Sequence, residues 1–141
     1  MGEAWQYQLR VYLGDELAGV ARREPGAAAL RPLTEVLDRH GAALMNQFGA
    51  FEAYVAEAER NGVEQYPLYK WTKATVEDPA QRAKHGRTFA VHVRGQEVYG
   101  RAEADALEAE LRPLAGGPVV ERMTRHDTNP ANNLAVPAEY R

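Results

Sequence analysis

Cysteine is absent from all 141 positions of the chain. A disulfide framework, a thiolate zinc site and a cysteine nucleophile are therefore excluded. Long apolar runs are absent too: the longest uncharged stretch, residues 41–51, is interrupted by Asn46 and Gln47. A membrane-spanning helix needs roughly 20 consecutive apolar residues. These absences favour a cytoplasmic protein without a membrane partner.

The motifs of several large enzyme classes are also missing. The sequence has no Walker-type glycine loop, no G-x-G-x-x-G, no G-x-S-x-G and no H-E-x-x-H. This argues against a nucleotide-dependent enzyme or a serine hydrolase of a familiar type. His85, His92 and His126 lack the close pairing that makes a metal site specific. We therefore expect neither a metal nor a cofactor.

Length and charge set further bounds. The chain is one domain long, 45% hydrophobic and 26% charged, which is close to an average globular protein. Its formal net charge is −3, from 17 basic and 20 acidic residues. Dedicated nucleic-acid binders are usually basic because much of their affinity comes from neutralised phosphates. The charge balance therefore argues against nucleic acid as the main partner.

Four segments have the character of strands. Residues 5–13 and 87–94 alternate between apolar and polar side chains, as a half-buried strand does. Residues 66–76 are aromatic and β-branched, and the early Pro67 suits an edge strand. Residues 118–126 form the last predicted strand.

Helical spacing appears in two longer segments. Apolar residues recur at steps near three and four from Leu30 to Ala58, and Asn61-Gly62 is a strong stop signal. Gly41 divides this stretch, either inside one long or kinked helix or as the C-cap of the first of two helices, and the continuous apolar phase favours the single helix. Residues 101–114 form the second helix. Asp78-Pro79 predicts a short additional helix over 79–85, whereas residues 15–26 read as a connection.

The order of the main elements predicts an α+β fold. Strand, long helix, strand, strand, helix, strand is the βαββαβ order of the ferredoxin-like fold, with both helices on one face of an antiparallel sheet. Dimeric α+β barrels share this architecture. We expect one domain over residues 1–126, an extended arm over 127–141, and a homodimer that covers the open sheet face.

The face that the helices leave open carries the candidate site. Alternation gives it an excess of cations and no carboxylate, although the whole chain is acidic. The face is predicted to hold Gln6, Gln8, Arg10 and Tyr12 from the first strand, His92 and Arg94 from the third, Val120, Arg122, Thr124 and His126 from the last, and Lys70 from the second.

This cluster predicts a site for a small anionic organic molecule. Arg10, Arg94, Arg122, His126 and Lys70 are the expected ligand-binding residues, since arginine gives a carboxylate or phosphate forked hydrogen bonds. His92 is the candidate general base and Tyr12 the candidate donor to a developing oxyanion. Proton-transfer, isomerase or lyase chemistry without a cofactor would suit these groups. A non-catalytic interaction or structural module and, more weakly, a single-stranded RNA-binding module remain the alternatives.

Overall fold

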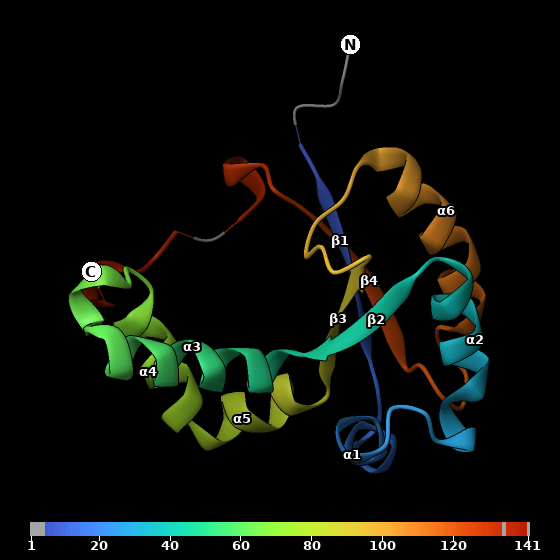
Figure 1. The fold of residues 1–141 in the computed structure, drawn as a ribbon, viewed down its shortest axis with the longest axis horizontal. Helices are drawn as coiled ribbons and strands as arrows, with labels where there is room; N and C mark the ends of the chain where they lie inside the picture. Colours follow the sequence, from blue (N-terminus) through green and yellow to red (C-terminus); the bar gives the residue numbers. More distant parts are fainter. Residues whose placement is uncertain (1–4, 134, 141) are drawn as a thin grey trace.

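The computed structural model describes residues 5–133 and 135–140. It has an α+β fold around one four-stranded sheet, in which every neighbouring pair of strands is antiparallel. The strands are β1 (Tyr7–Tyr12), β2 (Ala42–Asn46), β3 (Thr88–Val93) and β4 (Arg122–Asp127), in the order β2-β3-β1-β4. The helices are α1 (Asp15–Arg23), α2 (Arg31–Arg39), α3 (Gln47–Asn61), α4 (Tyr69–Glu77), α5 (Pro79–Gly86) and α6 (Arg101–Leu111). Figure 1 shows their arrangement.

The hydrophobic core lies on one face of the sheet. Alternate residues of the two central strands point into it, and Leu9, Val11 and Val91 are completely buried. The helices α1, α2 and α6 cover this face with buried leucines, valines and alanines. They are Ala18, Ala21, Leu33, Val36, Leu37, Ala104, Leu107 and Leu111.

Tyr99 joins the two central strands at a point where they separate. The backbone N–H of Leu9 donates to the Tyr99 hydroxyl at 2.8 Å, and this hydroxyl donates to the carbonyl of Val91 at 2.9 Å. The ring is 3% exposed. One side-chain hydroxyl therefore satisfies two buried backbone groups that would otherwise lack partners.

Several sequence predictions are confirmed. The strands expected over 5–13 and 87–94 are β1 and β3, and they pair in antiparallel register, with Arg10 opposite Ala90. The helices expected over 79–85 and 101–114 are α5 and α6 with its short 3-10 extension. The last strand is present but begins at Arg122. Val120, which the sequence placed on the open face, is instead fully buried in the core, because it precedes that strand.

The prediction of a single helix from Leu30 to Ala58 is wrong. Gly41 has a φ of 62° and reverses the chain after α2, and Ala42–Asn46 then forms edge strand β2 before α3 begins. Leu44 falls at a helical spacing from its neighbours, yet it packs against the core from a strand opposite Val91. A single apolar residue can fit the spacing of a helix and that of a strand. The helical spacing of apolar residues across Gly41 therefore does not indicate a continuous helix.

The strand predicted over 66–76 is also wrong, because most of this segment forms α4. The helix packs against α3, and the Thr75 hydroxyl donates to the Trp71 carbonyl one turn earlier. This packing against α3 overrides the strand propensity of its β-branched and aromatic residues. The expected ferredoxin-like arrangement thus stays a prediction, since its second strand is not where the sequence placed it.

The segment read as a connection over 15–26 contains α1. Asp15 and Glu16 occupy its first turn, and Arg22 and Arg23 occupy its last. This charge order matches the helix dipole and was a signal available in the sequence. Buried Ala18 lies on its inner face.

The helices form two groups rather than one layer. Helices α1, α2 and α6 cover the core face, whereas α3, α4 and α5 pack together and extend away from the sheet (Figure 1). The C-terminal segment runs from β4 to this second group, where Tyr140 lines a pocket with Trp71 and Phe51. In the described part of the chain, no helix is both long and apolar enough to cross a membrane.

Residues 1–4, 134 and 141 lie outside the described residues. The limits predicted for the domain (1–126) and for the arm (127–141) therefore include positions that the structure does not describe. Within the described part of the arm, Asp127 accepts hydrogen bonds from the Asn129 backbone at 3.0 Å and from the Asn132 side chain at 2.9 Å. This carboxylate fixes the turn that follows β4.

Candidate functional site on the open sheet face

The sheet face opposite the core carries a row of polar side chains from β1 and β4. The register places Gln8 opposite His126, Arg10 opposite Thr124, and Tyr12 opposite Arg122. Residues two apart on a strand share a face, and directly paired residues of neighbouring strands share it too. These six residues are called the β1–β4 cluster below.

Arg10 lies at the centre of the β1–β4 cluster. Its Nε donates to Oε1 of Gln8 at 2.7 Å, and Gln8, which is 7% exposed, donates in turn from its side chain to the Glu97 carbonyl at 3.0 Å. Burial lowers the pKa of Arg10, while Tyr12 and Glu97 act in the opposite direction. The guanidinium remains charged, since arginine does not lose its proton in proteins.

The two terminal amino groups of Arg10 are available for a ligand. Among the described residues, neither of them hydrogen-bonds to the protein, and no carboxylate forms an ion pair with Arg10. Both amino groups are also accessible to water, because every buried side-chain nitrogen of the described chain has a hydrogen-bond partner and these two do not. A half-buried cation is thus held by a neutral amide and keeps its paired Nη donors for a ligand.

A chain of hydrogen bonds runs beside Arg10. The Tyr12 hydroxyl lies 3.2 Å from Oγ1 of Thr124, and this oxygen lies 2.8 Å from Nε2 of His126. The guanidinium of Arg122 stacks 4.0 Å from the centre of the Tyr12 ring. The Thr124 hydroxyl thus connects the phenol of Tyr12 to the imidazole of His126, an arrangement through which a proton can move.

The positive charge of Arg10 acts on two histidines. Burial and Arg10 lower the pKa of His126, with Arg122 adding to the effect and Asp127 opposing it. Burial, then Lys84 and Arg10, lower the pKa of His85 on α5. His85 is held by a 2.8 Å hydrogen bond between Nδ1 and Gln47 and by the edge of the Phe51 ring. Both imidazoles are therefore mainly neutral at pH 7 and able to accept a proton.

Not all the predicted site residues lie together. Four of them are in the β1–β4 cluster: Arg10, Tyr12, Arg122 and His126. Half-buried His92 lies on β3, opposite Ala43, and points to the same face of the sheet.

Two predicted positions are wrong. Arg94 follows β3 with a φ of 49° and pairs with Glu103 of α6 at 2.9 Å, so the end of the strand turns it away from Arg10. Lys70 is exposed on α4, because the strand on which it was placed does not exist.

Sequence reasoning missed the supporting groups. Gln8 and Thr124 were assigned to the correct face, but nothing in the alternation shows that Gln8 holds Arg10 or that Thr124 joins Tyr12 to His126. Nothing in the sequence connects His85 with Arg10, because the influence of Arg10 on this histidine depends on how α5 packs. The carboxylate of Glu97, in the loop after β3, raises the pKa of Arg10, and strand alternation does not predict this influence.

The described residues contain no group of three or more His, Asp or Glu side chains placed to hold a metal ion. The chemistry that the β1–β4 cluster can perform is anion binding by Arg10 and proton exchange by histidine and tyrosine. No family model, curated protein or solved structure matches the chain. The function of the protein therefore has to be inferred from these residues.

Proposed function

We propose that the protein binds a small organic anion at Arg10 on the open sheet face. The observation that carries the proposal is a half-buried guanidinium held through Nε by a neutral amide, with its two Nη groups free of protein partners in the described chain. A carboxylate or phosphate would accept both Nη donors and neutralise the charge. The neighbouring imidazoles add no negative charge that would repel the anion.

We further propose proton transfer without a cofactor as the reaction class. His126 or His85 would accept the proton, since the pKa of each is lowered and each is neutral at pH 7. Tyr12 would stabilise negative charge on a ligand oxygen, and Thr124 links it to His126. His92 on β3 remains a candidate base on the same face. Isomerisation and elimination both use such a set of groups.

The RNA alternative has less support. Base stacking needs open aromatic surfaces on the sheet, and Arg122 already lies over the Tyr12 ring. A purely structural or protein-binding role predicts that no small anion changes the stability of the protein.

A thermal-shift screen separates these functions. Sulfate, phosphate and a series of organic acids are tested against the wild type, Arg10→Met and Arg31→Met, the last an exposed arginine of α2 that serves as a control. The proposal predicts an anion that stabilises the wild type and the control but not Arg10→Met. It fails if no anion stabilises the wild type or if Arg10→Met responds equally.

We also propose a homodimer and a ferredoxin-like arrangement of the sheet. The strand order with β1 and β3 central, and its fully antiparallel pairing, support the arrangement, although three helices separate β2 from β3.

Edge strand β2 and its exposed Met45 support association of two copies, including the barrel type of dimer. Light scattering at micromolar concentration tests it, and a mass near 15.7 kDa would contradict it. The lack of cysteine supports cytoplasmic location.

A further inference from the structure

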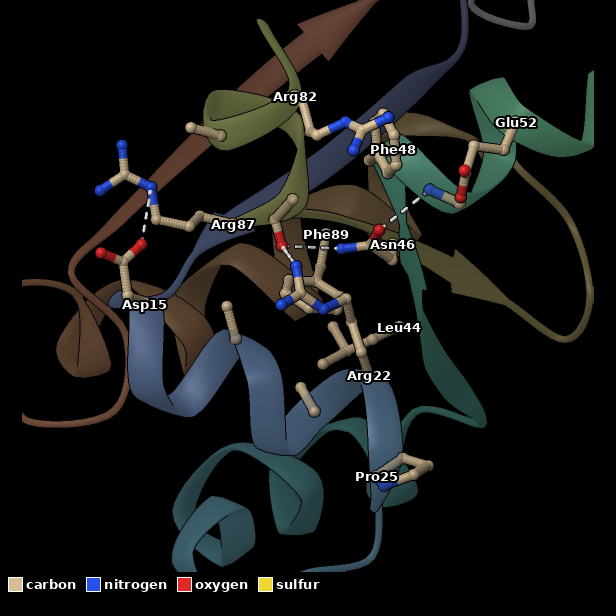
Figure 2. A pocket seen from close by; sticks show the side chains of 15 residues that line it. Asp15, Arg22, Pro25, Leu44, Asn46, Phe48, Glu52, Arg82, Arg87 and Phe89 are labelled. Atoms are coloured by element: carbon tan, nitrogen blue, oxygen red, sulfur yellow. Dashed lines mark hydrogen bonds and ion pairs between the residues drawn. The ribbon is translucent and has the colours of Figure 1, made fainter. Parts of the chain in front are cut away.

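A cleft lies on the other side of the sheet from Arg10, at the level of Phe89 and Leu44. Its walls come from α1, β2 with the start of α3, and α5, and its volume is about 890 Å³. Figure 2 shows Arg22 and Arg82 entering it from different elements. Ligand-binding pockets typically measure about 300–1,000 Å³, so the cleft is large enough for a small organic molecule.

The floor of the cleft is apolar. Phe89, Leu44 and Phe48 line it together with small residues of α1. Phe89 and Leu44 are on the core side of the sheet, whereas Arg10 and Ala90 are on the opposite side. The cleft and the β1–β4 cluster are therefore separate sites with different surroundings.

Two arginines of the cleft lack a carboxylate partner. Arg22 donates from Nη1 to the Gly86 carbonyl at 2.8 Å, and Arg82 stacks 5.2 Å from the centre of the Phe48 ring. Neither forms an ion pair within the described chain, whereas Arg87 lies 3.6 Å from Asp15. Arg22 and Arg82 therefore bring positive charge to the cleft without an ion-pair partner in the described chain.

The Gly86 carbonyl holds the walls of the cleft in place. It accepts from Arg22 of α1 and also from the side-chain amide of Asn46 at 3.0 Å, and Oδ1 of Asn46 caps α3 by accepting from the Gly49 backbone at 2.9 Å. Three elements thus meet at one carbonyl oxygen (Figure 2). Such a preformed site loses little entropy when a ligand binds.

The charge balance favours a single negative charge on the ligand. Arg22, Arg82 and Arg87 line the cleft with two carboxylates, Asp15 and Glu52. A strongly charged anion would meet these carboxylates, and a neutral molecule would leave the arginines uncompensated. A monoanion can use the two unpaired arginines while its apolar part covers the aromatic floor.

We infer that this cleft binds a small organic monoanion with an apolar aromatic or aliphatic body. The guanidinium groups hold its acidic group, and Phe48 and the floor of the cleft hold its body. The inference goes beyond the proposed anion site at Arg10 and does not depend on it, because no residue is shared between the two.

Titration calorimetry with 2-naphthoate tests the inference. Acetate carries the charge without the body, and 2-naphthalenemethanol carries the body without the charge. We expect the wild type to bind 2-naphthoate at least about tenfold more tightly than either compound, since a hydrogen bond to a charged group and burial of an aromatic body each commonly contribute that factor.

Variants of the chain locate the site. The variants are compared in the Arg10→Met background, so that no carboxylate is held at Arg10. There, Arg82→Met and Phe48→Ala are expected to weaken 2-naphthoate binding about tenfold or more, whereas the control Arg31→Met leaves it unchanged. Arg22→Met also removes a bond between α1 and α5, so the exposed Arg82 carries the test if that variant does not fold. The inference is overturned if Arg82→Met binds as the Arg10→Met parent does, if binding is lost in that parent, or if 2-naphthoate does not bind.

Discussion

Arg10 and Gln8 lie two residues apart on β1, and the Nε of Arg10 donates to Oε1 of Gln8 at 2.7 Å. Because Gln8 is buried and bonded to the Glu97 carbonyl, it fixes where the guanidinium points. Replacing Gln8 with Met keeps its length but removes both hydrogen bonds. We expect Gln8→Met to lower the free energy of unfolding by about 1–3 kcal/mol, the usual cost of leaving a buried polar group unpaired.

Urea denaturation measures this loss, and the exposed Gln6 provides the control, because its hydrogen bond to Thr128 uses the backbone N–H and not the side chain. Gln6→Met is expected to change stability by less than about 0.5 kcal/mol. Equal effects of the two substitutions would show that Gln8 does not hold Arg10.

The bridge made by Tyr99 gives a second prediction. Tyr99→Phe removes a hydroxyl that accepts from the Leu9 N–H and donates to the Val91 carbonyl in the middle of the sheet. We expect a loss of about 1–3 kcal/mol, since both backbone groups stay buried without a partner. Tyr66→Phe removes a hydroxyl bonded to exposed Asn61 and should cost much less. A similar loss in the two variants, measured by urea denaturation, would contradict the bridge.

The histidines predict how stability depends on pH. Burial, with the charge of Arg10, lowers the pKa of both His85 and His126 from the ordinary 6.5. The unfolded chain therefore binds more protons than the folded protein below about pH 6.5, and the free energy of unfolding falls as the pH falls through that value toward the folded pKa.

Denaturation at several pH values between 7.5 and 5.5 measures this fall. His126→Gln is expected to make the dependence shallower, and the double variant with His85→Gln shallower still. A pH dependence unchanged in the double variant would show that other groups cause it.

An anion at Arg10 should raise the pKa of both imidazoles, so sulfate should bind more tightly as the pH decreases.

Gly41 distinguishes the observed chain path from a continuous helix by the sign of one substitution. In a helix, alanine is more favourable than glycine by about 1 kcal/mol. At the φ of 62° seen here, a side chain is strained, so Gly41→Ala should destabilise the protein by about 1–2 kcal/mol. Gly49→Ala near the start of α3 meets only ordinary contacts and should be neutral or stabilising. A stabilising Gly41→Ala would contradict the turn before β2.

The sequence predicted the parts of the fold in which local pattern and tertiary packing agree. Alternation located β1 and β3 and separated the core face from the polar face, and the Asp78-Pro79 signal located α5. It failed where a short element depends on its partner. Strand β2 has five residues and packs as an edge beside β3, so no local period reveals it.

The candidate site was predictable to the same degree. Strand alternation is enough to place Arg10, Tyr12 and His126 on one face. It cannot follow a side chain after its strand ends, which is why Arg94 was misplaced, and it cannot show that α5 brings His85 toward Arg10. The hydrogen bonds that position Arg10 and Tyr12 depend on side-chain geometry, and no sequence spacing encodes them.

Side-chain NMR during a sulfate titration tests directly whether Arg10 binds an anion. The resonances of Arg10 Nε–H and of the His126 and His85 rings are followed at pH 6.5 in the wild type, Arg10→Met and Arg31→Met. If the anion binds at Arg10, these resonances show saturable shifts in the wild type and the control, and the histidine resonances do not shift in Arg10→Met. Wild-type resonances that do not move, or histidine shifts that persist in Arg10→Met, would contradict an anion site built on Arg10.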